Sequence, residues 1–329
     1  MFQPDNYAIA LAMMLITMIC WGSWANTMKL TPGWPFPLFY WDYVAGVLII
    51  SLILGLTMGS TGGPDAMLAN LGRADGLHIF YALAGGTVFN LANLLLVAAI
   101  SIAGLAVAFP VGIGIALIVG VLLNYVLAPA ANPVLLFSGV ALVLAAIIVD
   151  ALAYRARGDE KHADVGRGLK LAIACGILMG MFYPLVTKSM LGGGGLGPYS
   201  VSFVFSAGVF LSSFVLNTWF MRRPITGDPP CRFEHYRAAS TATHLAGIAG
   251  GAIWGVGMTF SLVAATTHFV GTAVSYAIGQ GATMVSAAWG VFVWREFSGA
   301  PASARRLLML MFALFLIGLG LVAIAPLYA

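Results

Sequence analysis

Long apolar stretches, separated by short polar or turn-forming segments, fill almost the whole chain. A membrane-spanning helix needs about 20 mostly apolar residues, and prolines, glycine runs and charged residues mark the breaks between such stretches. Two junctions, at 101–103 and 266–267, are short enough to predict tight hairpins. The pattern predicts ten transmembrane helices, at about residues 7–29, 36–58, 76–100, 103–127, 134–154, 168–190, 199–221, 241–265, 267–294 and 305–326.

A weak internal repeat divides the sequence into two halves. The stretches 84–108 and 249–273 both begin with Ala-Gly-Gly, and they lie about 165 residues apart in a chain of 329. In membrane proteins, such repeats are typical of secondary transporters, where two related units surround a central site and give it two access states. We therefore expect a first five-helix repeat at 1–154, a short charged cytoplasmic linker at 155–167 and a second five-helix repeat at 168–329.

The composition identifies the lipid bilayer as the environment of these helices. Hydrophobic residues make up 61% of the chain and charged residues 8%, whereas a soluble domain has roughly 45–50% and about 25%. The net charge of +4 would suggest a nucleic-acid partner in a soluble protein, but the basic residues of cytoplasmic loops explain it here. We expect a multi-pass membrane protein with no nucleic-acid partner.

The basic residues are distributed unevenly among the loops. Thirteen of the fifteen lysines and arginines fall in odd-numbered loops, and the other two are Arg73 and Lys188. Because basic loops stay in the cytoplasm, both termini are predicted on the periplasmic side of a bacterial-type inner membrane. Five helices in each half then require the second half to enter from the opposite side, so the predicted repeat is inverted.

The sequence contains no recognisable enzymatic or metal-binding arrangement. The three cysteines lack C-x-x-C spacing, and the five histidines form no ligand cluster. The motifs of serine hydrolases, P-loop proteins and zinc proteases are also absent. We therefore predict a protein that is not an enzyme and that uses no metal and no cofactor.

Asp42 is the sharpest polar signal within the apolar stretches. It lies in the sequence Tyr-Trp-Asp-Tyr, roughly two turns into the predicted helix 36–58. A carboxylate at membrane depth is costly and normally faces a cavity or a partner, which suits a proton-coupling group. The alternative is a structural carboxylate that is hydrogen-bonded to helix ends or paired with Lys29.

Two other acidic residues near helix ends have a simpler interpretation. Asp150 lies near Arg155, and Glu296 follows Arg295 directly. We expect both carboxylates to form ion pairs at the membrane interface.

Three amide side chains fall near the middle of predicted helices. Asn90 and Asn93 lie three residues apart and therefore on one helix face, and Gln280 lies between two glycines in the second half. Amides in hydrocarbon need hydrogen-bonding partners. They either join neighbouring helices or bind polar groups of a solute, and the sequence leaves both interpretations open.

The amides and several aromatic rings together predict a solute-binding site near the membrane midplane, with Asp42 as the group that takes up a proton. An aromatic ring inside a membrane helix can stack on a flat solute or on a sugar face, although ordinary packing is the alternative for each ring. One side of the site would be formed by Asn90 and Asn93, and the opposite side by Trp254, Tyr276 and Gln280. Trp24 and Tyr183 would close its two ends.

Short motifs spread over nearly the whole chain carry a family resemblance. They are Trp21-Gly-Ser-Trp24, Trp41-Asp42-Tyr43, AGGTVFNLAN at 84–93, Gly104-Leu-Ala-Val107, Leu123-Asn124-Tyr125, Phe182-Tyr-Pro184, Leu216-Asn217 and AWGVFVWRE at 288–296. In this order and spacing, they resemble the ureide permease family of the drug/metabolite transporter superfamily.

The resemblance implies a secondary-active, proton-coupled importer of a small polar metabolite such as allantoin, uracil or xanthine. The plant members of the family have a longer central loop than 155–167. A sugar or nucleoside importer of the same architecture, taking up ribose, glucose or rhamnose, and a drug or metabolite exporter are the alternatives. Na⁺ instead of a proton as coupling ion, and a monomer or a homodimer, also remain open.

Overall fold

All regular structure in the described part of the chain is helical. The computed structural model describes residues 1–62, 66–157, 164–225 and 229–329. Within these ranges, nine helices are long and apolar enough to cross a bilayer. The expected all-helical membrane protein is therefore confirmed.

The long helices follow most of the predicted apolar stretches. In chain order, they are α1 (Tyr7–Ser23), which continues into the 3₁₀ helix η1 (Trp24–Leu30), α2 (Phe36–Leu56), α4 (Gly76–Ala103), α5 (Leu105–Leu127), α6 (Pro133–Arg157), α7 (Val165–Met190), α8 (Pro198–Ser213), which is followed by α9 (Leu216–Arg222), α11 (Thr241–Ala265) and α14 (Ala302–Ile324). The short elements η2 (Met58–Ser60), α3 (Met67–Arg73), α10 (Phe233–Arg237) and η4 (Ala325–Tyr328) lie between or after them. Parts of the predicted breaks at 59–64 and 224–230, and of the predicted linker at 155–167, lie outside the described residues.

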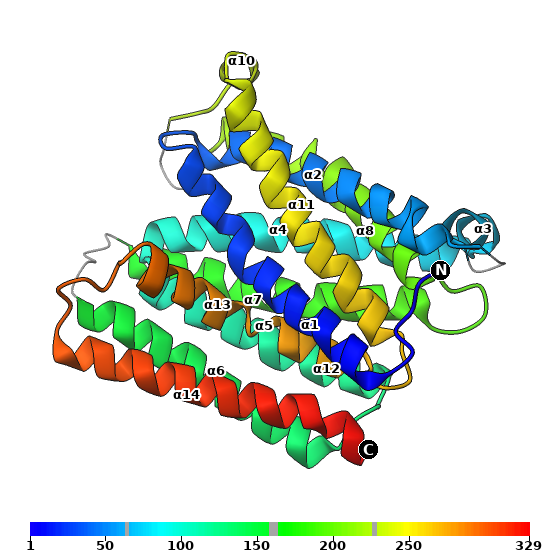
Figure 1. Ribbon diagram of the computed structural model, residues 1–329. Helices are drawn as coiled ribbons and strands as arrows, with labels where there is room; N and C mark the ends of the chain where they lie inside the picture. The colour runs from blue at the N-terminus through cyan, green and yellow to red at the C-terminus, as the bar shows by residue number, and fades with distance from the viewer. Residues whose placement is uncertain (63–65, 158–163, 226–228) are drawn as a thin grey trace.

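The long helices form one bundle with two distinct ends (Figure 1). In Figure 1, α6 and α14 lie side by side along one edge, and α2 and α8 lie along the opposite edge. Both chain termini lie at the end that carries α3, whereas α10 lies at the other end. Backbone hydrogen bonds hold the two termini, from Phe2 N to Met58 O (2.7 Å) and from Asn132 N to Ala325 O (3.0 Å). We call these the terminal end and the α10 end.

The predicted continuous helix at 267–294 is wrong, because this segment is divided into three pieces. They are α12 (Thr272–Gly279), α13 (Ala282–Ala288) and the π-helix η3 (Trp289–Val293). The first break falls at Gln280, which has a glycine on either side, and glycine is a poor helix former. The ring of Trp21 on α1 fills the space that a side chain at Gly279 would need. Close packing against α1 therefore favours glycine where the helix is interrupted.

Two connections begin a helix with a glycine in the left-handed region. Gly104 alone joins α4 to α5 and has a φ of 81°, so the predicted hairpin at 101–103 is confirmed. The predicted turn at 266–267 is longer and runs from Thr266 to Gly271, which has a φ of 79°. Glycine adopts this conformation without the steric cost that a side chain brings.

Paired glycines let two helix crossings approach backbone to backbone. Between α2 and α11, Gly46 faces the carbonyl of Ile248, and Gly251 faces the carbonyl of Tyr43. Between α4 and α8, Gly86 and Gly208 face the carbonyls of Phe205 and Leu83 in the same reciprocal way. The hydrophobic effect does not drive helices together in lipid. Small residues at such crossings instead allow close van der Waals packing between the two backbones.

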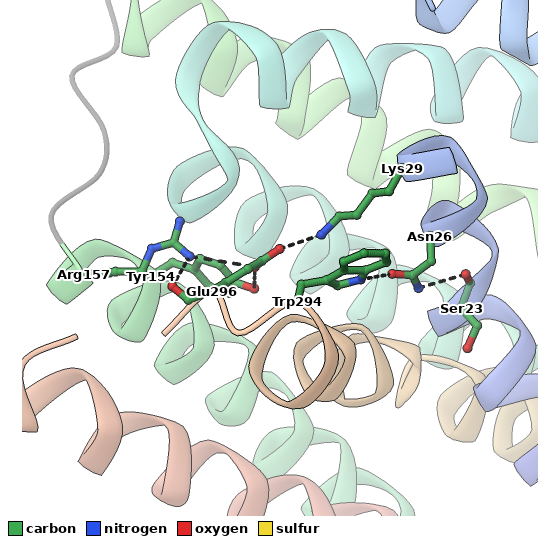
Figure 2. A network of polar contacts seen from close by, with 7 residues as sticks. All are labelled: Ser23, Asn26, Lys29, Tyr154, Arg157, Trp294 and Glu296. Atoms are coloured by element: carbon green, nitrogen blue, oxygen red, sulfur yellow. Dashed lines mark hydrogen bonds and ion pairs between the residues drawn. The ribbon is translucent and has the colours of Figure 1, made fainter. Parts of the chain in front are cut away.

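A polar network centred on Glu296 joins three segments that are far apart in sequence (Figure 2). One carboxylate oxygen lies 2.8 Å from Lys29 Nζ of η1, and the other lies 3.8 Å from Arg157 Nη1 of α6. The Tyr154 hydroxyl donates to the second oxygen at 3.2 Å. Glu296 therefore forms an interfacial ion pair as expected, but its partners are Lys29 and Arg157 instead of Arg295.

The neighbouring Trp294 strengthens the same junction. Its indole N–H donates to Asn26 Oδ1 at 2.6 Å, and the Lys29 ammonium lies 4.3 Å from the centre of its ring. Asp150 behaves differently, because it is buried and no ion pair among the described residues joins it to Arg155. The expected interfacial pairing of Asp150 is therefore wrong.

We expect Glu296→Gln to lower the melting temperature of the purified protein in detergent by roughly 1–3 °C, since partly exposed ion pairs contribute about 0.2–1 kcal/mol each. Lys29→Gln should have a similar effect, and the double variant should lose less than the sum of the two single losses, because the ion pair between the two side chains is counted in both. Arg305→Gln, at an exposed position at the start of α14, is the matched charge control. Additive losses at Lys29 and Glu296 would contradict the network.

Candidate functional site

Four of the predicted site residues lie in one continuous cluster of aromatic rings. Trp24 contacts Tyr43 (ring centres 4.7 Å apart), Tyr43 contacts Trp254 (6.5 Å), and Tyr183 contacts Tyr276 (5.1 Å). Phenylalanines complete the path between Trp254 and the two tyrosines. We call this set the aromatic core: Trp21, Trp24, Tyr40, Tyr43, Phe89, Phe182, Tyr183, Phe205, Trp254 and Tyr276.

The two tyrosines of the second half use their hydroxyl groups within the protein. Tyr276 donates to the carbonyl oxygens of Ala116 (3.2 Å) and Met179 (3.3 Å), and the Tyr183 hydroxyl lies 2.8 Å from Ser261 Oγ. Both side chains are fully buried. In this conformation, the hydroxyl groups fix the rings against α5, α7 and α11.

The structure separates the two neighbouring asparagines. Asn90 Nδ2 lies 3.1 Å from Val209 O and 2.8 Å from Ser212 Oγ, so it binds α4 to the end of α8. Asn93 Nδ2 instead lies 3.3 Å from the Tyr40 hydroxyl, beside the aromatic core. The first amide therefore has the geometry of a helix–helix contact, and the second has that of a residue at the edge of the predicted site.

Gln280 lies at the break between α12 and α13 and is 9% exposed. Directly before it, Gly279 packs against the ring of Trp21 in the aromatic core. The break thus brings an amide side chain and interrupted backbone next to the aromatic core. Broken membrane helices of this kind are tolerated where neighbouring helices or a cavity satisfy the freed backbone groups.

Two buried polar atoms beside Trp254 have no hydrogen-bonding partner within the described residues. They are the Trp21 indole N–H and the Tyr43 hydroxyl, whose rings lie 5.7 and 6.5 Å from that of Trp254. Unpaired polar atoms are unfavourable in an apolar interior and each needs an explanation. A solute or water molecules bound beside Trp254 would supply the missing partners.

A cavity of about 380 Å³ lies at the α10 end and approaches the aromatic core. Its walls include Trp34, Phe36, Leu94 and Phe220. Phe36 contacts the Tyr40 ring (5.2 Å), and Leu94 directly follows Asn93, so the cavity ends about one helical turn from the Tyr40–Asn93 hydrogen bond. Its volume is within the range of small-molecule pockets, roughly 300–1,000 Å³.

Asp42 is buried near this cavity and is held by two side chains from the second half. The Tyr236 hydroxyl donates to Oδ1 at 2.5 Å, and His244 Nδ1 lies 2.8 Å from Oδ2. Burial and the hydrogen bond to Asp42 raise the pKa of Tyr236 above its usual range, so this hydroxyl stays protonated and donates. The alternative interpretation in which Asp42 pairs with Lys29 is wrong, because Asp42 binds Tyr236 and His244 and Lys29 binds Glu296.

His244 and Tyr236, which we group with Asp42 as the Asp42 cluster, are functional candidates that the sequence did not reveal. His244 lies in the first turn of α11 and could have been noticed as a titratable group at the end of an apolar stretch. Tyr236 lies on the short helix α10, in a segment that reads as a polar loop and gives no signal of contact with Asp42.

Comparisons with known proteins agree with the architecture. The sequence model of the ureide permease family matches residues 39–169 and 165–325. Ureide permease 2 of Arabidopsis thaliana is 24% identical over 400 residues, covering 98% of both chains, and Ureide permease 1 of the same plant is 24% identical over 387 residues, covering 97% of both.

Among solved structures, a crystal structure of a protein that is 16% identical superposes with a TM-score of 0.64, covering 94% of this chain and 96% of that one. This likeness establishes that the fold is shared with an experimentally determined structure. The two matched regions of the family model together span most of the sequence. The chain therefore belongs to the ureide permease family, whose members are membrane transporters and not enzymes.

Proposed function

We propose that the protein is a proton-coupled secondary transporter that imports a ureide or a nucleobase by alternating access. The observation that carries the proposal is a cavity that leads from the α10 end toward buried amide and aromatic side chains, in a chain of the ureide permease family. Stacking surfaces and amide groups suit a flat solute with hydrogen-bonding edges. The named relatives are ureide permeases, which agrees with this class of solute.

We infer that the transporter has ten crossings in two inverted repeats, 1–154 and 168–329. Both termini lie at one end, which requires an even number of crossings. Nine long helices are described. The remaining segment starts at the terminal end, where Gly271 before α12 contacts Ala130. It finishes at the α10 end, where the residues after η3 contact Asn26 and Lys29. The pieces α12, α13 and η3 would together form the tenth, discontinuous crossing, as in many transporter folds.

The contacts between helices support the same repeat. The pair α2–α11 and the pair α8–α4 each cross through reciprocal glycines. When the first repeat is aligned with the second, α2 corresponds to α8 and α4 to α11, so one crossing is the repeat-related copy of the other. Gly104 before α5 and Gly271 before α12 share the same left-handed conformation at matching places. Two equivalent units can rock against each other along such an interface, and alternating access needs this motion.

In this proposal, the α10 end faces the cytoplasm and the cavity is the inner vestibule. The solute would lie beyond Asn93, between Trp254, Tyr276 and Gln280, with Trp24 and Tyr183 at its two ends. Asp42 would carry the proton, with His244 as its partner.

The proposed orientation predicts the behaviour of C-terminal fusions in a bacterial host. Alkaline phosphatase fused after Ala329 should be active, because it folds only in the periplasm, and green fluorescent protein at the same position should be dark. Both fusions inserted after Arg223 should show the opposite pattern. A fluorescent C-terminal fusion would contradict the orientation.

The transport proposal predicts that an inward proton gradient stimulates uptake into proteoliposomes. We would compare labelled allantoin, uracil, xanthine, ribose and glucose, each with a proton gradient, with a Na⁺ gradient and with neither. Asp42→Asn should lower gradient-driven accumulation by roughly tenfold or more, since the amide cannot take up the proton. Normal pH-dependent uptake by this variant would remove Asp42 from coupling, and uptake of sugars alone would change the solute class.

The two asparagines should respond differently to substitution. Asn90→Ala should lower the melting temperature without raising the KM for the transported solute, because its contacts with Val209 and Ser212 bind helices together. Asn93→Ala should raise the KM by roughly tenfold, the usual effect of losing one polar solute contact of about 1–1.5 kcal/mol. A raised KM for Asn90→Ala at unchanged stability would contradict this division of roles.

A further inference from the structure

Trp34 contacts both the cavity and the Asp42 cluster. Its side chain is part of the cavity wall. Its ring also packs edge-on against His244, with ring centres 5.4 Å apart, and against Tyr236, with ring centres 6.4 Å apart. These are the two side chains that hold the Asp42 carboxylate. One indole ring therefore contacts both the space open to a small molecule and the two side chains that hold the buried acid.

The indole N–H of Trp34 is buried and has no hydrogen-bonding partner among the described residues. An indole nitrogen only donates, so a buried N–H without an acceptor makes this ring position unfavourable. Pro35 restricts the backbone after Trp34, whereas Gly33, with a φ of 78°, precedes it. An acceptor in the cavity would give the indole ring a reason to change position.

The charged groups around the cluster are few. Asp42 on α2 is contacted by Tyr236 from α10 and by His244 from α11. The other titratable residues of α10, Glu234, His235 and Arg237, are exposed, and in the described part of the chain no hydrogen bond or ion pair joins them to Asp42. From η1, Lys29 is directed to Glu296. The ring of Trp34 is an uncharged surface that packs directly against His244.

We propose that Trp34 couples occupancy of the cavity to protonation of the His244–Asp42 pair. A small neutral solute with a carbonyl oxygen accepts the indole N–H and draws the ring away from His244 and Tyr236. His244 is already 24% exposed, so the ring acts through its contact with the imidazole: when that contact is lost, the affinity of the pair for a proton changes. Because such linkage is reciprocal, protonation of the pair changes the affinity of the cavity for the solute by the same factor. This role rests on the proposed proton-coupled transport.

The test compares two modes of transport in proteoliposomes, with labelled allantoin and labelled uracil as probes. Exchange of solute at equal pH on both sides reports solute binding and movement, and accumulation driven by an inward proton gradient reports coupling. For Trp34→Ala, we expect exchange to persist, its half-saturating concentration to become independent of pH between 5.5 and 8, and gradient-driven accumulation to fall by roughly tenfold. Trp34→Leu keeps apolar bulk at this position and serves if the alanine variant does not fold.

Phe220→Ala is the matched control, because Phe220 lines the same cavity and its recorded ring contact is with Trp219, outside the Asp42 cluster. It should weaken solute exchange while leaving the pH dependence unchanged. His244→Gln should remove the pH dependence, and adding Trp34→Ala to it should change that dependence no further.

Two results would overturn the inference. The first is a wild-type pH dependence in both Trp34 variants, and the second is an equal loss of exchange and accumulation in folded Trp34→Leu. An absence of pH dependence in the wild-type protein would instead remove the proposed proton coupling, and this inference with it.

Discussion

The structure depends on the need of every polar group to find a partner away from water. In the hydrocarbon of a bilayer, an unpaired backbone or side-chain group is costly, so the chain crosses as helices whose backbone bonds are internal. The same requirement explains why Asn90 binds α8 and why Asp42 is held by Tyr236 and His244. Two of the buried polar groups that have no partner within the described residues are informative, because the indole N–H of Trp21 belongs to the aromatic core and that of Trp34 to a ring that lines the cavity.

Close helix crossings provide the framework that positions these groups. Reciprocal glycines bring α2 against α11 and α4 against α8, and the aromatic core lies between the two crossings. Because association in lipid relies on packing instead of the hydrophobic effect, such contacts are tight but contain few strong bonds. The Glu296 network adds a charged contact between η1, α6 and the segment after η3 at the α10 end. The bundle thus combines rigid crossings with a polar junction at one end.

The Asp42 cluster, Trp34 and the cavity form a short path from the buried acid to a space large enough for a small solute. Each step in it is a direct contact between side chains, from Asp42 to His244 and from His244 to Trp34, which lines the cavity. Coupling between solute binding and protonation requires a structural element that contacts both sites and has two arrangements. The presence of two sites in one protein is not sufficient. In the proposed coupling, this element is the ring of Trp34, whose indole N–H has no acceptor among the described residues.

The sequence by itself determined the membrane environment, the positions of nine long helices and the family, because apolar length, turn residues and ordered motifs are local properties of the chain. It also singled out Asp42, since a carboxylate among apolar residues stands out without any structure. Tertiary structure decided the partners of that carboxylate, because Tyr236 and His244 are distant in sequence and meet it only where α10 and α11 pack on α2. It also decided the packing beside Gln280, where the ring of Trp21 on α1 occupies the space that a side chain at Gly279 would need. Local pattern fixes which segments are helices, whereas the partner of a polar side chain depends on which helices come together.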